Sequence, residues 1–428
     1  MTFDCLGDLA RFRFVAALFE CSLRAPTHKF IRTMRTRLHA IAELIALNGA
    51  TVACICATLS VLNPSNPKAR GELSTDAVNS ATVLGTLLNG LMAFTVVRLL
   101  CYQSPEVRAP RAVKHDDSTS VIDDSWRDAL RQYRPNDLRP PIAWPTVALA
   151  LVGVGAWLGG AWAGHTRRVP SGLASLICAV GIFLSFTPMH DAVHRALVPK
   201  SHVWNDVLGY VSALPFAGVY RVFSFIHLAH HAHLNDPASD PDHWAGSGPL
   251  LFLPLRWLTA FNNYHAYAVG RSLDEVRWER VVNLDLGVIM PAFLTVLWWM
   301  WDMSAIHYWL LPFLGSTTWL MYVFDYLPHR PHHNTTDPFV ATSVITGAPS
   351  LIRKDAPSPF LTALLLSQNM HNVHHLMPTV PFYRYGLVWT ACADELRRRG
   401  TRELPWLLWP SREAHLPELH AESHAKLE

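Results

Sequence analysis

Six stretches of this 428-residue chain are apolar over a length that can cross a lipid bilayer. They are 38–62, 78–101, 142–164, 170–189, 283–301 and 304–325. The hydrocarbon core offers the backbone no water, so an apolar segment of about 20 residues crosses it as a helix. Charged residues make up only 16% of the chain, against roughly 25% in soluble proteins. The predicted fold class is therefore all-α, a polytopic membrane helical bundle.

The basic residues predict how this bundle is oriented. Lys and Arg outnumber acids in residues 1–37 and are frequent in 102–141, and such segments stay in the cytoplasm. Six spans return the chain to the same side, so both termini and the later polar regions are predicted to be cytoplasmic. Arg167 and Arg168 fall on the predicted outer side and count against this topology. Three further apolar stretches contain polar residues and are predicted to be interfacial helices: 203–222, 249–269 and 358–370.

The same pattern divides the chain into five parts. A basic cytosolic segment, 1–37, precedes two extra membrane helices in 38–101 and a cytosolic linker, 102–141. The main membrane domain, 142–397, contains the other spans and a cytosolic cap with the histidine-rich segments. A polar tail, 398–428, is expected to be poorly ordered.

Histidine is abundant, with 23 residues, and most of them gather in short patterns with helical spacing. One pattern is HxxxH and two are HxxHH, so that residues three or four apart share one face of a helix and can converge on a metal. The histidines of these three boxes are His190, His194, His227, His230, His231, His371, His374 and His375. All three boxes lie on the same predicted side of the membrane.

A ninth histidine, His329, follows the sixth apolar stretch and is predicted to join the boxes, although alone it could be a surface loop residue. Imidazole suits Zn, Cu, Fe and Ni, but a zinc ion takes only three or four protein ligands. Nine nitrogens suit two metals, and such a shell fits iron, whereas a bis-histidine haem would use only two of them. His233, His332 and His333 are expected to lie outside the metal shell or face solvent.

Acidic and amide side chains near the boxes could orient the imidazoles by hydrogen bonding to them. The candidates are Asp191, Asp236, Asp240, Asp242, Asp325 and Asn369. Each is equally a candidate helix cap or turn residue, as in the sequence Asp240-Pro. Both interpretations stay open at this point.

These residues resemble the membrane fatty acid desaturase superfamily, whose mark is three histidine boxes at cytosolic helix ends. The sequences that flank the boxes resemble one branch of this superfamily more closely, the cyanobacterial-type β-carotene hydroxylases. The matching segments are HDAVH, HLAHHAHLNDPASDPDH, FDYLPHRPH and QNMHNVHHLMPTVPFYRY. Carotenoid ketolases are similar at YLPHRP, but their second box lacks the long continuation found here.

The resemblance covers about residues 140–397 and implies two non-haem irons held by the eight box histidines, with His329 as an extra ligand. It also implies O₂ as co-substrate and an external electron donor, such as ferredoxin with its reductase. The N-terminal 140 residues and the insertion 333–357 depart from the family pattern.

Three functions remain open. The first is hydroxylation of a carotenoid ring, and the second is desaturation or hydroxylation of a fatty acyl chain, which the same ligands would serve. The third is non-enzymatic binding of metal or haem in the membrane. The net charge of +3 gives no case for nucleic acid.

An oxidised substrate would be lipid-soluble and would reach the site from the membrane lipids. Aromatic residues that could line its tunnel, but that fit ordinary packing better, are Trp204, Phe216, Trp319, Phe324 and Phe382. The chain contains no GxGxxG in a βαβ setting and no iron–sulfur cysteine spacing, so electrons must come from a separate protein.

Overall fold

The described residues of the computed structural model all lie within one compact unit and are 124–272, 276–332, 337–347 and 357–404. The predictions for the basic segment 1–37 and the extra helices in 38–101 fall outside these residues. The same holds for parts of the insertion 333–357 and for the tail after residue 404.

Two long helices form an antiparallel hairpin, α5 (Trp144–His165) and α6 (Ser171–Val193). Both are apolar on all faces, as expected for helices surrounded by lipid and protein. They pack closely because glycines face each other: a Cβ on Gly181 would lie 2.7 Å from the carbonyl oxygen of Gly153. The spans predicted at 142–164 and 170–189 are confirmed as helices, and α6 continues four residues further, to Val193.

A third long apolar helix runs over Arg280–Ser304 and confirms the predicted span 283–301. It consists of the end of α11 (Val276–Leu284), η7 (Asp285–Ile289), α12 (Met290–Trp301) and η8 (Asp302–Ser304). The chain then turns back as a helix made of η9 (Ile306–Leu310), α13 (Leu311–Leu320), η10 (Met321–Tyr326) and α14 (Leu327–His329). This last helix covers the predicted span 304–325, but it is not among the three described helices that are long and apolar enough to cross a membrane.

The helix predicted over 203–222 is interrupted. α7 (His202–Ala213) and the short η4 (Leu214–Phe216) are followed by α8 (Tyr220–Ala232), at an angle of 99°. The break falls at Ala217 and Gly218, whose φ angles are +58° and +71°. Glycine adopts this left-handed conformation without strain. The two halves together are long and apolar enough for one broken span.

Between α8 and the third span, short helices replace the predicted interfacial helix 249–269. They are η5 (Pro241–Ala245), η6 (Leu250–Phe252), α9 (Leu253–Leu258) and α10 (Ala260–Ser272). α10 packs against α8 and α13 and forms one wall of the interior described below.

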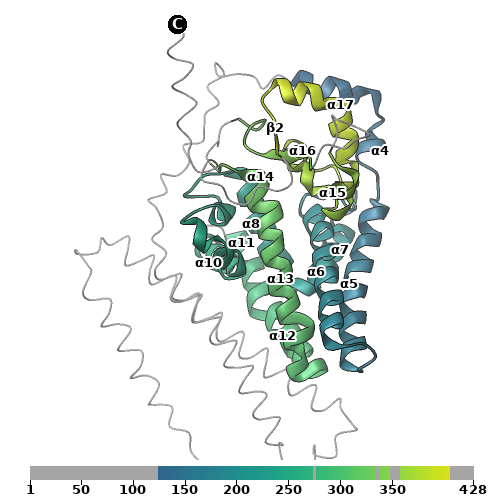
Figure 1. Cartoon of the computed structure of the whole chain (residues 1–428), viewed down its shortest axis with the longest axis vertical. Helices are drawn as coiled ribbons and strands as arrows, with labels where there is room; N and C mark the ends of the chain where they lie inside the picture. Colours follow the sequence, from purple (N-terminus) through teal and green to yellow (C-terminus); the bar gives the residue numbers. More distant parts are fainter. Residues whose placement is uncertain (1–123, 273–275, 333–336, 348–356, 405–428) are drawn as a thin grey trace, which may run out of the picture. The chain divides into compact units, whose positions relative to one another are not determined.

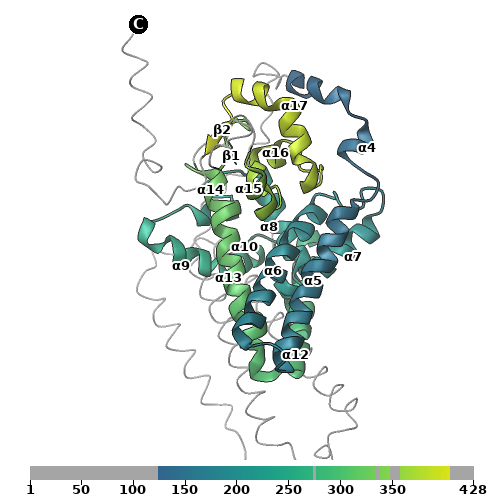
Figure 2. The same ribbon diagram turned by 45° about the vertical axis from the view of Figure 1, so that its right-hand side comes forward.

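A small second layer, here called the cap, covers one end of the helices (Figures 1 and 2). Its elements are η3 (Asp124–Gln132), α4 (Pro135–Leu138), β1 (Ser343–Ile345), α15 (Pro359–Leu364), η11 (Gln368–Met370), α16 (His371–Leu376), η12 (Phe382–Arg384), α17 (Tyr385–Arg398) and β2 (Arg402–Leu404). A separate apolar core holds it together, with Trp126, Val373 and Trp389 fully buried.

Two predicted boundaries shift in the cap. Part of the predicted linker 102–141 lies in the cap, where η3 packs on α17 and Trp126 is buried. The first residues of the predicted tail 398–428 also belong to the cap, since β2 pairs in parallel with β1, Ser343 opposite Arg402.

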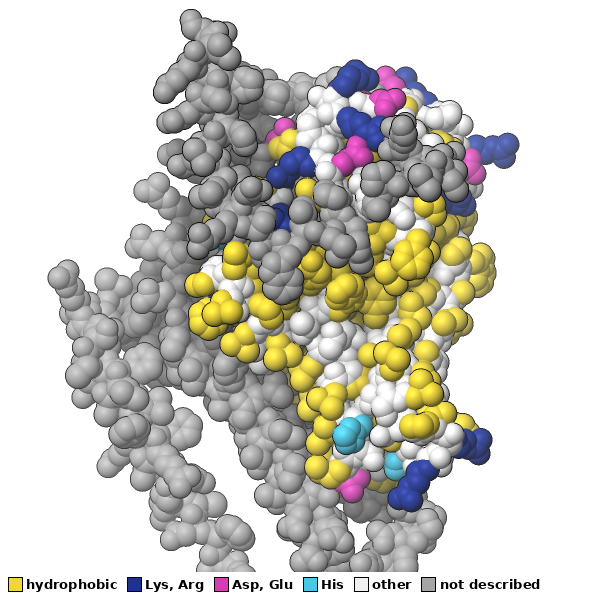
Figure 3. All heavy atoms as spheres, in the orientation of Figure 1, with side chains coloured by type: hydrophobic (Ala, Val, Ile, Leu, Met, Phe, Trp, Pro, Cys, Tyr) yellow, Lys and Arg dark blue, Asp and Glu magenta, His cyan; other side chains and the backbone are white. Residues whose placement is uncertain are grey.

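Large apolar side chains cover the outside of the helices below the cap, while charged side chains gather on the cap and at the opposite end (Figure 3). Trp144, Leu151 and Leu176 are each more than half exposed. Such a surface would be unstable in water and is stable in lipid. The protein is an integral membrane protein.

Candidate metal centre

The first histidine box lies at the end of α6. His190 is in the last turn and His194 follows the helix directly, so both rings leave the same face. Both are buried. The Nε2 atom of His190 lies 3.1 Å from Nε2 of His374, and that of His194 lies 2.8 Å from Nε2 of His227. The first box thus meets both other boxes.

The second box, on α8, divides between two groups. His227 and His231 point to the first box, with their Nε2 atoms 3.1 Å apart. His230, one residue before His231, turns away, and its Nε2 atom lies 3.3 Å from Nε2 of His375.

The third box, on α16, divides in the same way. Nε2 of His374 lies 2.9 Å from that of His231, in the first group. His371 and His375 belong to the second group, with Nε2 atoms 3.0 Å apart. His329, at the end of α14, completes this group through Nε2 of His371 at 2.9 Å.

All nine predicted histidines therefore converge in two adjoining groups. The ring nitrogens lie within 4.8 Å of one another in each of two tetrads. The first tetrad is His190, His194, His227 and His374, and the second is His230, His329, His371 and His375. His231 lies between them, within the same distance of His374 and His375.

The donor set fits two nitrogen-bound metal ions. Burial lowers the pKa of His371, His374 and His375 well below the ordinary value, so these imidazoles are neutral and offer a lone pair. Two ligand nitrogens, each about 2.1 Å from one ion, lie roughly 3.0–3.4 Å apart. The observed contacts of 2.8–3.3 Å match this spacing. A metal cation in each tetrad would bind the Nε2 lone pairs that face each other there.

The sequence model of the fatty acid desaturase family matches residues 167–405, more than half of the chain and all nine histidines. The chain belongs to the fatty acid desaturase family. Its members are oxidoreductases, and the predicted superfamily is confirmed.

Individual relatives of this desaturase-family protein fall into two kinds. A β-carotene ketolase of a Paracoccus species is 29% identical over 209 residues, which cover 48% of this chain and 72% of the relative. A β-carotene ketolase of Haematococcus lacustris is 26% identical over 230 residues, 51% of this chain and 64% of the relative. An sn-1 oleoyl-lipid 12-desaturase of a Picosynechococcus species is 24% identical over 219 residues, which cover 45% of this chain and 60% of the relative. These relatives are ketolases and desaturases. The resemblance to carotenoid hydroxylases stays a prediction from the sequences that flank the histidine boxes.

Three of the predicted supporting residues contact the histidines of this desaturase-family site. Oδ1 of Asp240 lies 2.9 Å from Nδ1 of His230, and Asp240 also accepts the backbone N–H groups of Asn235 and Asp242. Oδ1 of Asp191 lies 3.7 Å from Nδ1 of His190. The Asp191 carboxylate accepts hydrogen bonds from Thr146 and from the backbone of Phe382, so it also ties α6 to the cap. Asp242 is a third, 3.4 Å from Nδ1 of His230.

Asp236 and Asn369 are placed differently from that prediction. Asp236 accepts the backbone N–H of Ala238, a turn contact, and the Asn369 amide donates to Ile345 and Thr362. Within the described residues, neither side chain makes a hydrogen bond to an imidazole ring. Their alternative reading, as turn and loop residues, fits the structure.

Tyr385 is a supporting residue that the sequence reasoning missed. Its hydroxyl lies 2.9 Å from Nδ1 of His374, and it is fully buried at the start of α17. A hydrogen bond there leaves Nε2 of His374 free to bind metal. The only available signal was a tyrosine a fixed distance after the third box, within the segment that resembles the family.

Histidines predicted to lie outside the metal shell do so where they are described. His332 is buried, and its ring contacts His243, Tyr326 and His329. His233 caps the end of α8 and is half-buried. His333 lies outside the described residues.

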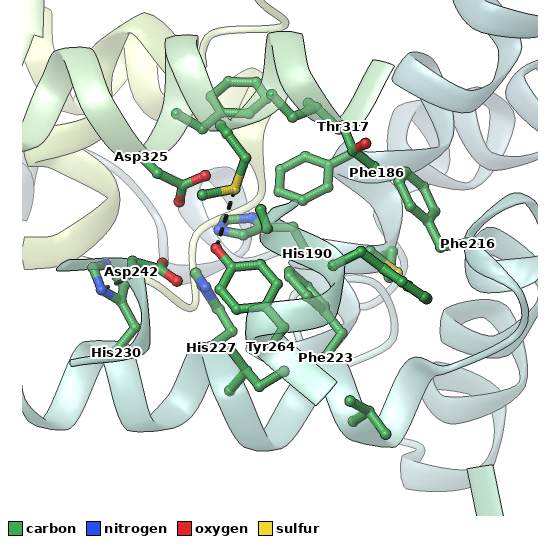
Figure 4. A pocket seen from close by; sticks show the side chains of 18 of the residues that line it. Phe186, His190, Phe216, Phe223, His227, His230, Asp242, Tyr264, Thr317 and Asp325 are labelled. Atoms are coloured by element: carbon green, nitrogen blue, oxygen red, sulfur yellow. Dashed lines mark hydrogen bonds and ion pairs between the residues drawn. The ribbon is translucent and has the colours of Figure 1, made fainter. Parts of the chain in front are cut away.

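An apolar cavity adjoins both groups of histidines (Figure 4). Four of the nine histidines form part of its wall: His190, His227, His230 and His371. The rest is mainly apolar and comes from α6, α8, α10, α13 and η10, with Phe186, Phe223 and Met321 prominent. A chamber of this kind holds a hydrophobic molecule beside the metal site and keeps water away from it.

Three polar side chains meet where the cavity approaches His230: Asp242, Tyr264 and Asp325 (Figure 4). Burial raises the pKa of Asp242, although its contact with His230 opposes the shift. Burial also raises the pKa of Tyr264 well above its ordinary value, so the phenol stays protonated, and its hydroxyl donates to Sδ of Met321 at 3.3 Å. Among the described residues, no hydrogen bond joins Asp325 to a histidine ring.

The predicted tunnel aromatics separate into two sets. Phe216 and Phe324 line the cavity. Trp204 is 63% exposed and Trp319 is 41% exposed on the outer surface, and Phe382 packs in the cap core. Packing, the simpler interpretation, holds for these last three.

Proposed function

We propose that this protein is an O₂-dependent di-iron oxygenase that oxidises a ring C–H bond of a carotenoid. The observation that carries the proposal is the apolar cavity whose wall includes histidines of both tetrads. One iron would be held by the first tetrad and one by the second, with His231 between them. Two bound irons would supply the reduction of O₂ and the removal of hydrogen from an unactivated carbon.

The chain's own residues would place the substrate. The ring of Phe186 stacks on His190 with centroids 5.8 Å apart, and that of Phe223 stacks on His227 at 5.4 Å. These two rings hold the imidazoles in their orientation and form an apolar surface beside them. A hydrocarbon ring resting there has a C–H bond directed at the histidine wall, and geometry of this kind decides which carbon reacts.

Enclosure serves the same chemistry. Phe186 packs on Phe324 at 5.2 Å and on Phe216 at 6.3 Å, which closes the cavity with aromatic rings. Excluding water protects the oxidising species from side reactions.

Carotenoid specificity rests on two lines of support. The relatives named above include β-carotene ketolases, and the flanks of the second and third boxes resemble carotenoid hydroxylases. Hydroxylation inserts one oxygen atom into a ring C–H bond, and a ketone needs a second oxidation of the same carbon. We propose hydroxylation as the primary reaction, with the ketone as a product of repeated turnover.

Acyl-chain desaturation is the second candidate. The similarity to sn-1 oleoyl-lipid 12-desaturases favours it. The same histidines and the same cavity would hold a fatty acyl chain, and removal of two neighbouring hydrogens would give a double bond.

The test is expression in bacteria that make β-carotene, with a ferredoxin and its reductase supplied. Pigments and membrane lipids are both analysed by mass spectrometry. A carotenoid that gains oxygen supports the proposal. Unchanged β-carotene with acyl chains that have lost two hydrogens supports the second candidate, and no change in either would refute both. The variants His230→Ala and His374→Ala, one from each tetrad, should abolish turnover.

We also propose that the metal centre and both termini face the cytoplasm, where a soluble electron donor can reach the cap. A protease added to sealed inside-out vesicles should then cleave a tag at the C-terminus. Protection of the tag would reverse the orientation.

A further inference from the structure

Apart from the metal-facing histidines, the cavity wall has three buried polar atoms without a hydrogen-bond partner: Oδ1 of Asp242, Nε2 of Gln368 and Nε2 of His265. Asp242 lies beside His230, the Tyr264 hydroxyl donates to Sδ of Met321, and the hydroxyl of Thr317 donates to the carbonyls of its own helix. Gln368 lies three residues before His371, at the metal end. His265, on α10, remains.

The protonation of His265 is set by its surroundings. The ring is only 5% exposed, and its Nδ1 atom lies 2.6 Å from the carbonyl oxygen of Phe261. A carbonyl can only accept, so Nδ1 carries the proton. Burial lowers the pKa of His265 to about 4, so the ring is neutral in the cell. The other nitrogen, Nε2, is therefore an acceptor with a free lone pair.

Nε2 of His265 is buried and has no hydrogen-bond partner in the protein. Leaving a buried polar atom unpaired is costly, and native proteins rarely do so. Within the described residues, no ring contact joins His265 to any of the nine histidines, and its ring partner is Phe261, with centroids 4.0 Å apart. The missing partner is therefore not the metal centre and belongs to whatever fills the cavity.

We propose that Nε2 of His265 accepts a hydrogen bond from a hydroxyl group already present on the lipid substrate. This inference rests on the proposed carotenoid oxygenase function and specifies its substrate further. A lone pair recognises an O–H donor and gains nothing from a carbonyl or a hydrocarbon. Because His265 stands apart from the metal-facing histidines, the recognised hydroxyl sits on a different carbon from the one oxidised. A separate hydroxylation of the hydrocarbon must then supply this substrate.

The experiment compares two pigments with the purified, iron-loaded enzyme, ferredoxin and reductase. One pigment is β-carotene, and the other is the same carotenoid with one hydroxyl on each ring. We expect kcat/KM for the hydroxylated pigment to be roughly tenfold higher, as is usual when a buried acceptor is satisfied. The variant His265→Phe keeps a ring and loses the acceptor, so the preference should disappear, mainly through a higher KM for the hydroxylated pigment.

Two further variants complete the design. His265→Gln restores an acceptor on a flexible chain and should recover part of the preference. His307→Phe, the same substitution at an exposed position at the far end of the bundle, should leave the preference unchanged. Two irons per chain in each purified variant will show that it has folded.

The outcomes separate the two proposals. If the wild type oxidises neither pigment, the carotenoid function fails and the inference fails with it. If it oxidises both pigments equally, the carotenoid function stands and the hydroxyl contact is refuted. A preference that survives in His265→Phe also refutes the contact, because the preference then does not depend on Nε2 of His265.

Discussion

At the scale of single residues, the two ends of each imidazole have separate tasks. Nε2 faces the metal site in all nine histidines, and Nδ1 is hydrogen-bonded to the protein in two of them: His230 to Asp240 and His374 to Tyr385. One of these supports belongs to each tetrad. Losing either hydrogen bond should weaken metal binding mainly in the tetrad to which that histidine belongs.

Replacing Asp240 by Asn removes the carboxylate that holds His230 and two backbone N–H groups. We expect iron binding and turnover to fall by about 10–100-fold, as is typical for such supports. The matched control is Asp236→Asn, four residues earlier, which loses only a turn contact. Metal analysis and product formation measure both variants. Equal behaviour of the two would contradict the assigned roles.

Tyr385→Phe tests the other tetrad. It deletes one hydroxyl, leaves Nδ1 of His374 without a partner, and should lower turnover by roughly tenfold. Tyr383→Phe is the control, since Tyr383 is only half-buried and makes no hydrogen bond to a histidine within the described part of the chain. A Tyr385→Phe enzyme with full activity and full iron content would remove Tyr385 from the site.

At the scale of elements, the position of the first box depends on close contact between α5 and α6. A Cβ on Gly181 would lie 2.5 Å from the backbone nitrogen of Trp157, which cannot move away. Gly155, on the same hairpin, has open space around it.

Gly181→Ala should therefore destabilise the protein by about 1–3 kcal/mol through overpacking and lower turnover by displacing His190. Gly155→Ala should be neutral or slightly stabilising, since alanine favours the helix. Thermal unfolding in detergent, followed by fluorescence, measures both. A Gly181→Ala protein as stable as the wild type would mean that the two helices can separate without cost.

The elements also show what a sequence can and cannot reveal. Three spans and the histidine boxes were predictable because apolar length and the spacing i, i+3, i+4 are local signals. His329 was predicted to lie with the histidine boxes only because it follows the end of an apolar stretch. The break at Gly218 was missed because the apolar composition continues through it. Tyr385 reaches His374 from the next helix, and Nε2 of His265 has no partner in the protein, so no helical periodicity marks either residue.

At the scale of the whole molecule, the metal centre joins otherwise separate layers. α6, α8 and α14 contribute six of the nine histidines, and α16 in the cap contributes three. With the proposed irons bound, the cap would be attached to the bundle through the metals as well as through packing.

Removing iron with a chelator should loosen the cap and lower the unfolding temperature, because ligand rings that faced a cation are left facing each other. Adding back Fe²⁺ under anaerobic conditions should restore the temperature and give close to two irons per chain. Metal analysis and thermal unfolding are the measurements. One iron or a haem per chain would favour a binding protein over an enzyme.

The division of the third box between the tetrads has a consequence for synthesis. His374 completes one tetrad, and His371 and His375 complete the other, so a nascent chain that ends before these residues has neither set entire. With the proposed irons, translation would have to pass position 375 before either ion could have all its ligands. The proposed oxygen chemistry would then start only in chains synthesised past this point.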